Sequence, residues 1–149
     1  MSAVIDRHPE VESYRRSLAR GITMGNLLNL AEAGGVAIVE ERGSRPATAL
    51  VELGRLRHML ARLIEPHMAV ASSEDGRWCI RLPGLPVLGE GASFDEASAD
   101  LIEAMREYAD DWADHLHAAP NHEANEYFAH FVKLSNDEQL REWIYSAER

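Results

Sequence analysis

The sequence is nearly free of cysteine, since Cys79 is the only thiol among its 149 residues. A single cysteine cannot form an internal disulfide or a CxxC metal or redox site. The sequence also lacks any stretch approaching 18 consecutive apolar residues, so it predicts no membrane-spanning helix. The first ten residues, which include Asp6, Pro9 and Glu10, contain no apolar segment of the signal-peptide kind. Together these absences favour a cytoplasmic protein.

The common catalytic motifs are missing as well. The sequence contains no glycine-rich phosphate-binding loop and no GxSxG nucleophile elbow. Cys79 lies between Trp78 and Ile80 in an expected strand, where a structural thiol is the favoured interpretation. We therefore expect no nucleophilic catalysis.

A cluster of histidines is the strongest remaining sign of an enzyme. Four of them fall within 16 residues, close to three aspartates: His115, His117, His122 and His130, with Asp110, Asp111 and Asp114. The pair His122-Glu123 resembles the start of the HExxH zinc motif, but position 126 is glutamate. A metal-dependent hydrolase using His115, His122 and the aspartates stays open as an alternative. We favour a solvated helix face, and we expect no enzyme, no metal and no cofactor.

Charge is distributed unevenly along the chain. Residues 1–62 carry nine arginines and seven acidic residues, a net charge of +2, whereas residues 63–149 carry six basic and 18 acidic residues, a net charge of −12. The first part would attract an anionic partner and the second a basic protein. The other interpretation is an acidic surface that serves only solubility.

The first half alternates helical and strand-like patterns. Thr23 is suited to cap a helix over residues 24–33, which Gly34-Gly35 would end. Strands are expected over 36–40 and 47–51, joined by a turn over 42–45. Leucines at helical spacing predict a helix over 53–64, which Pro66 would stop.

The second half predicts three strands and a long helix. The strands are expected over 68–71, 78–82 and 87–88, and Ser93 to Glu96 forms a capping box. The helix that follows carries an apolar stripe that must pack against those strands. Its members are Phe94, Ala97, Leu101, Met105, Tyr108 and Trp112.

The last 30 residues predict two amphipathic helices rich in aromatic side chains. One is expected over 123–134, and a second capping box, Ser135 to Glu138, opens the other. The apolar side chains either complete the core of the second half or lie in a groove of a partner protein. We expect the second arrangement, with the following contact residues: Tyr127, Phe128, Phe131, Leu140, Trp143, Ile144 and Tyr145.

Residues 19–63 resemble the Phd/YefM antitoxin family. The resemblance rests on Asn26 to Leu30, Gly34-Gly35, residues 36–39, the segment Glu41 to Ala47, and residues 49–51. It implies a dimer that binds operator DNA through its N-terminal face. Carried over, it implies DNA contacts at Arg20, Thr23, Arg42 and Arg45. Arg15 and Arg16 join the expected DNA contacts because arginine suits contact with phosphate.

Residues 67–112 resemble a HicB-type module, a small β-β-β-α unit. The matching segments are Trp78 to Pro86, Gly89, Gly91 and Ser93 to Ala97. That module is related to part of a ribonuclease-H sheet, but this sequence lacks the catalytic carboxylates on its strands. The resemblance therefore implies a use in binding.

Taken together, the sequence predicts an α+β protein with two small modules in tandem and a helical tail. The expected parts are a Phd/YefM-like DNA-binding and dimerisation domain (1–65), a HicB-like module (66–119) and a toxin-binding tail (120–149). The resemblances imply an antitoxin of a type II toxin–antitoxin system that binds its toxin and represses its own operon. The toxin would be a RelE/ParE-like or PIN-domain ribonuclease, which are usually basic. A stand-alone transcriptional regulator without a toxin is the main alternative.

Overall fold

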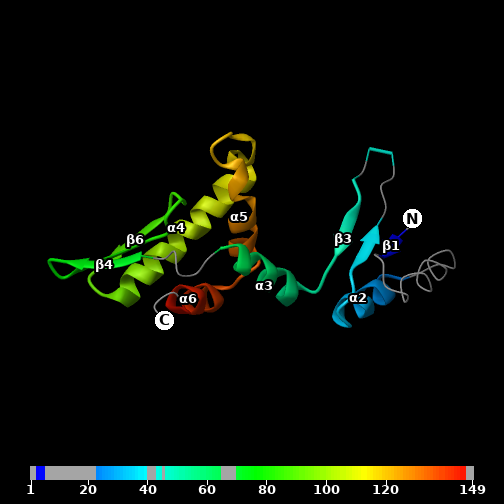
Figure 1. Cartoon of the computed structure of the whole chain (residues 1–149), viewed down its shortest axis with the longest axis horizontal. Helices are drawn as coiled ribbons and strands as arrows, with labels where there is room; N and C mark the ends of the chain where they lie inside the picture. The colour runs from blue at the N-terminus through cyan, green and yellow to red at the C-terminus, as the bar shows by residue number, and fades with distance from the viewer. Residues whose placement is uncertain (1–2, 6–22, 40–42, 45, 65–69, 147–149) are drawn as a thin grey trace. The chain divides into compact units, whose positions relative to one another are not determined.

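The computed structural model describes residues 3–5, 23–39, 43–44, 46–64 and 70–146. The chain divides into two compact units, Met1–Leu56 (unit 1) and Arg57–Arg149 (unit 2), which are described separately below (Figure 1). The division differs from the boundaries expected at residues 65 and 119. It falls inside a helix, and it groups the expected tail with the second module in one unit.

Unit 1 combines a three-stranded antiparallel sheet with a helix. Its elements are β1 (Ala3–Ile5), α2 (Met24–Glu32), β2 (Ala37–Val39) and β3 (Thr48–Leu50), and the strand order is β1-β2-β3. The helix and the pairing of β2 with β3 confirm the sequence prediction, whereas β1 was not foreseen.

The described part of unit 1 has a small core. Among its described residues, Leu27, Ala31 and Ala37 are buried hydrophobic side chains, and Leu30, Val39 and Leu50 pack against Leu27 and Ala37. Met24 and Leu28, on α2, are 65% and 46% exposed. A unit of this size therefore leaves large apolar side chains at its surface.

Helix α3 (Leu53–Leu63) crosses the division between the units. Its first turn is capped by Glu52, whose carboxylate accepts from the amides of Gly54 and Arg55 at 2.6 and 2.8 Å. Further along, Leu60 and Ala61 pack against the core of unit 2, and Ile64, just after the helix, is buried in that core. The second half of α3 therefore belongs to unit 2.

Unit 2 contains an antiparallel sheet followed by helices. The sheet has the order β4-β5-β6, formed by β4 (Val70–Glu74), β5 (Arg77–Arg81) and β6 (Leu88–Gly91). Next come α4 (Phe94–Asp114), the 3-10 turns η2 (Leu116–Ala118) and η3 (Glu123–Asn125), α5 (Glu126–Lys133) and α6 (Asp137–Ser146). No helix in the described part of the chain is long and apolar enough to cross a membrane.

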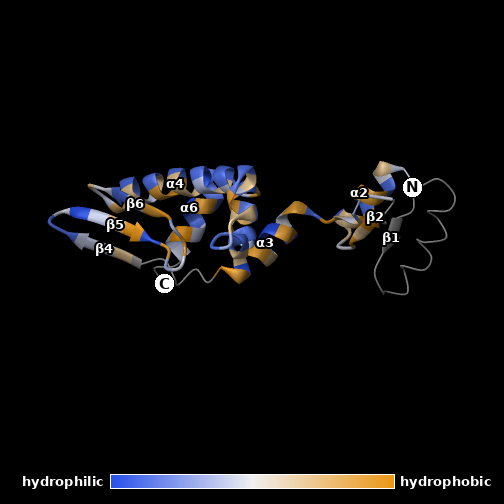
Figure 2. Ribbon diagram, turned by 90° about the horizontal axis from the view of Figure 1, so that it is seen from above, coloured by the Kyte–Doolittle hydropathy of each residue, from blue (hydrophilic) through white to orange (hydrophobic). Residues whose placement is uncertain are grey.

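The apolar stripe of α4 forms the centre of unit 2, as the sequence predicted. Five of its members are buried, from Ala97, Leu101 and Met105 at 0% exposure to Trp112 at 9%, and Phe94 packs at the edge of the core. The polar side of the helix faces away from the sheet (Figure 2). Because α4 contacts both the strands β5 and β6 and the helices α5 and α6, it joins the sheet to the tail.

Two glycines allow α4 to lie directly on the backbone of β6. A Cβ atom added to Gly89 would come within 2.2 Å of the Ala97 carbonyl oxygen, and one at Gly91 within 2.5 Å of the Ala97 amide nitrogen. Since backbone atoms cannot move aside cheaply, these positions require glycine. The close approach fixes where α4 sits on the sheet.

The helix caps agree with the sequence in part. Ser93 accepts from the Glu96 amide at 3.1 Å as expected, but the Glu96 carboxylate reaches the amide of Ala92 at 2.8 Å, one residue beyond the cap. The capping box expected at Ser135 to Glu138 is wrong by one residue. Asn136 and Gln139 exchange side-chain to backbone bonds of 2.8 and 2.9 Å, because the Ser135 hydroxyl donates to the Phe131 carbonyl instead.

Gly89→Ala should destabilise unit 2 by about 1–3 kcal/mol, because the added methyl group forces α4 away from β6. The measurement is urea unfolding followed by tryptophan fluorescence, since Trp78, Trp112 and Trp143 all lie in unit 2. Glu90→Ala is the neighbouring control, and it removes only an exposed ion pair with Arg77. Equal midpoints for the two variants would contradict the close-packing argument.

Candidate partner-binding surfaces

Most of the expected DNA contacts lie outside the described residues. This applies to Arg15, Arg16, Arg20, Arg42 and Arg45. Thr23 is described and exposed, and its hydroxyl is engaged in the cap of α2. That hydroxyl donates to the Asn26 side-chain oxygen at 2.9 Å and accepts from the Asn26 amide at 3.3 Å. It therefore has no proton left to offer a phosphate while the cap is intact.

Arg55 has a structural role that the sequence did not predict. Its guanidinium donates to the carbonyl oxygens of Gly34 and Ala31, the latter at 3.3 Å. These carbonyls lie at the C-terminal end of α2, where helical carbonyls lack intrahelical partners. Gly34 adopts a φ of +96°, which favours glycine and allows α2 to end there. Arg55 thus fastens the end of α2 to the start of α3 within unit 1.

The seven expected toxin-contact residues are largely built into the core of unit 2. Five are buried: Phe128, Phe131, Leu140, Trp143 and Ile144, none more than 8% exposed. Tyr127 and Tyr145 are half-buried. The sequence left open that the tail completes the core of the second half. These five side chains follow that alternative. Their contact with a partner stays untested, and it would require α5 and α6 to leave α4.

Tyr127 and Tyr145 occupy different surroundings. Tyr127 lines a pocket of about 110 Å³ together with Leu63 and Leu85, among others. Tyr145 stacks edge-on against Phe94, with ring centroids 5.1 Å apart, and its hydroxyl donates to the Asp95 carboxylate. These two are the members of the predicted set that keep accessible surface.

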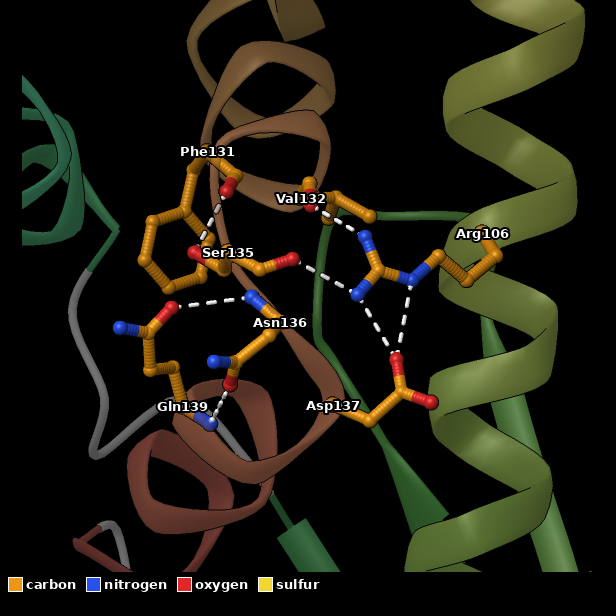
Figure 3. A network of polar contacts seen from close by, with 7 residues as sticks. All are labelled: Arg106, Phe131, Val132, Ser135, Asn136, Asp137 and Gln139. Carbon is orange, nitrogen blue, oxygen red and sulfur yellow. Dashed lines mark hydrogen bonds and ion pairs between the residues drawn. The ribbon is translucent and has the colours of Figure 1, made fainter. Parts of the chain in front are cut away.

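Arg106 holds the junction between α5 and α6 against α4 (Figure 3). Its guanidinium donates to the carbonyls of Val132 and Ser135 at 2.6 and 2.7 Å, and it pairs with Asp137 at 2.7 Å. From α3, Arg57 donates to the Leu134 carbonyl at 3.3 Å. Two arginines thus satisfy the carbonyls where α5 ends, and the Asp137 carboxylate anchors the start of α6.

The histidine cluster makes contacts that are local to the α4–α5 connection. His122 shares a hydrogen bond of 3.1 Å with the Tyr108 hydroxyl, and its carbonyl accepts from the Trp112 indole at 2.9 Å. His117 donates to the Trp112 carbonyl at 3.1 Å, and His130 lies against the Trp112 ring. Within the described ranges, no three His, Cys, Asp or Glu side chains are placed to hold a metal ion.

The exposed side of α4 is strongly acidic. Seven carboxylates share it: Glu96, Asp100, Glu103, Glu107, Asp110, Asp111 and Asp114. Several stand four residues apart, a spacing at which like charges destabilise a helix by about 0.2–0.5 kcal/mol per pair. Asp110 pairs with Lys133, and Asp114 lies 3.2 Å from His115. This face gives unit 2 a negative field that favours basic partners.

The chain is similar to a known protein at the level of structure. No known protein family matches the sequence, and no curated protein matches it. The structure is similar to the crystal structure of a protein from Syntrophomonas wolfei subsp. wolfei, described as an antitoxin part of a proposed toxin/antitoxin system. The TM-score is 0.64 and the identity 20%, over 89% of this chain and 91% of the other. At that identity the likeness is one of fold.

Arg106→Ala should loosen the α5–α6 junction and lower the stability of unit 2 by about 2 kcal/mol, because it removes charge-assisted bonds to two carbonyls and Asp137. Arg106→Lys should recover only part of the loss, since an ammonium group cannot reproduce the planar fork. Urea unfolding and backbone hydrogen exchange over 132–137 provide the measurements. Arg141→Ala, an exposed change on α6, is the matched control. Equal effects of Arg141→Ala and Arg106→Ala would contradict the role of Arg106 in holding the α5–α6 junction against α4.

Proposed function

We propose that this protein is the antitoxin of a type II toxin–antitoxin system. The observation that carries the proposal is the likeness of fold, over 89% of the chain, to a protein described as an antitoxin. The segments of the sequence that resemble Phd/YefM and HicB modules point to the same function. In this proposal the chain binds and neutralises a cognate toxin, and it represses its own operon by binding operator DNA.

The charge distribution supports a division of tasks between the units. Unit 2 carries 18 acidic and eight basic residues, whereas unit 1 carries seven of each, all seven bases being arginine. We assign the toxin to unit 2, because ribonuclease toxins of the RelE/ParE or PIN kind are usually basic. We assign operator DNA to unit 1, with Arg15, Arg16, Arg20, Arg42 and Arg45 as contacts; Thr23 caps α2 in the same unit.

The proposal includes a homodimer formed through unit 1. The unit has only 56 residues, and the part of it that the structure describes buries few apolar side chains, which is marginal for a domain that folds alone. A second copy that covers Met24 and Leu28 would complete its core. Light scattering during size exclusion tests this step, and a purely monomeric chain at micromolar concentration would count against it.

The toxin-binding function predicts a rescue. Expression of one neighbouring gene should arrest growth, and co-expression of this chain should restore it. The matched control is the same chain with a frameshift, which supplies the messenger RNA without the protein. If neither neighbour is toxic, and this chain binds neither product in a pull-down, the stand-alone regulator becomes the better explanation.

The DNA-binding function predicts a salt-dependent loss in an arginine variant. The double variant Arg42→Ala, Arg45→Ala should bind the protein's own promoter fragment more weakly. The slope of log affinity against log salt should fall by about 3.6 for the dimer, since two arginines are lost from each protomer and each phosphate contact contributes roughly 0.9. Arg77→Ala and Arg141→Ala in unit 2 are the controls and should leave binding unchanged. An unaltered slope in the double variant would remove both arginines from the operator contact.

A further inference from the structure

The two edges of the sheet in unit 2 differ in their contacts with the rest of the unit. β6 forms one edge and β4 the other, with β5 between them. At β6, the amide of Glu90 donates to the Asp100 carboxylate at 2.8 Å, and the amide of Ala92 donates to the Glu96 carboxylate at 2.8 Å. Carboxylates of α4 thus occupy amides along this edge, which blocks the addition of another strand there.

The edge at β4 has no such cover from the described residues. The register pairs Val70 with Arg81 and Glu74 with Arg77, so a two-residue turn, Asp75-Gly76, connects β4 to β5. In a hairpin of this kind the residues flanking the turn bond to each other, and bonding alternates along the strand. The backbone groups of Ser72 therefore face β5, whereas the amides and carbonyls of Ala71 and Ser73 face outward.

Both faces of β4 are accessible as well. Residues 71–74 are all exposed, including Ala71 and Ser73, which lie opposite Ile80 and Trp78 on the side of the sheet that α4 covers. The helix packs on β5 and β6 and makes no comparable contact with β4. A partner strand would therefore meet small side chains and no obstructing helix.

This edge carries few of the features that proteins use against unwanted pairing. Those features are a very short strand, charged side chains, proline, a bulge or an inward-pointing charge, and β4 has only the charge of Glu74 and a modest length of five residues. Residues 70–74 read Val-Ala-Ser-Ser-Glu, and their register with β5 is unbroken. The only charges are Glu74 and the turn residue Asp75, at one end. The β4 edge is open while the opposite edge, at β6, is blocked. This difference indicates that the β4 edge is available for pairing with another strand.

We propose that the outer edge of β4 binds an extended strand of a basic partner protein, which adds to the sheet as a fourth strand. The inference rests on the proposed function, in which that partner is the toxin. Charge decides the occupant: unit 2 has a net charge of −10, so pairing two β4 edges would bring two such units together. A strand from a basic protein instead meets an attractive field, and Glu74 and Asp75 suit a basic residue at the turn end.

The test uses the full chain and the product of the neighbouring gene that it neutralises. Ser73→Pro removes an outward amide and adds bulk at the edge, while a proline whose nitrogen faces solvent is tolerated on an edge strand. Ser73→Ala is the matched control, because it keeps the amide. Circular dichroism and the tryptophan-detected urea midpoint establish that each variant is folded.

We expect Ser73→Pro to weaken binding of that product about tenfold or more, through the lost hydrogen bond and the steric clash, and Ser73→Ala to leave it unchanged. Complex formation should also protect the amides of Ala71 and Ser73 from hydrogen exchange. Unchanged affinity in folded Ser73→Pro overturns the edge inference while the proposed function stands. Loss of self-association in Ser73→Pro without loss of partner binding assigns the edge to a second copy and overturns it too. If the unaltered chain binds neither neighbour, the proposed function fails and the inference fails with it.

Discussion

The packing of α4 onto the backbone of β6 is the contact on which unit 2 depends. Gly89 and Gly91 bring helix and strand close enough that any side chain at either position would strike Ala97. With its position on the sheet fixed, α4 presents the remainder of its apolar stripe to α5 and α6. Met105 and Tyr108 are buried in a core that also holds Phe128 and Ile144. Sheet and tail therefore share one core through a single helix.

The polar residues of α4 also bind backbone groups of the elements around the helix. Glu96 and Asp100 bind amides of the β6 edge, and Arg106 binds carbonyls at the end of α5. Each of these side chains satisfies a backbone group that would otherwise face solvent or be buried unpaired. The open edge of β4 is a consequence of the same geometry. The helix α4 lies over β5 and β6, and its carboxylates reach the edge of the sheet at β6 and not the edge at β4.

The sequence predicted the parts of the structure that depend on local pattern. The stripe from Phe94 to Trp112 follows helical spacing, and Ser93 and Thr23 are capping residues followed by suitable partners. Long-range contacts leave no such signal: Arg106 meets Ser135 across 29 residues, and Arg57 meets Leu134 across 77. The cap of α6 was misplaced because Ser135 and Asn136 are both good caps, and the choice depends on whether Phe131 offers its carbonyl to the serine.

The aromatic tail shows a further limit of pattern. Side chains such as Phe128 and Trp143 occur at the spacing of an amphipathic helix whether they face a core or a partner, since both environments are apolar. In the candidate sites, the composition of the sequence indicated that the second half is acidic, but not which surface a partner would meet. The edge of β4 carried no signal, because an open edge is defined by what other segments do not cover.

Burial also decides how costly each mode of partner binding would be. Withdrawing the tail from α4 would expose five large apolar side chains, each worth roughly 1.5–3 kcal/mol, or on the order of 10 kcal/mol in total. A partner would have to rebury them all before gaining any net affinity. Pairing at the β4 edge requires no such unfolding, because its amides and carbonyls already face outward on a fixed sheet. The acidic face of α4 adds long-range attraction, which raises the rate of encounter more than the strength of the complex. A folded tail, an open edge and an acidic helix are thus compatible with one binding mode, in which unit 2 remains intact.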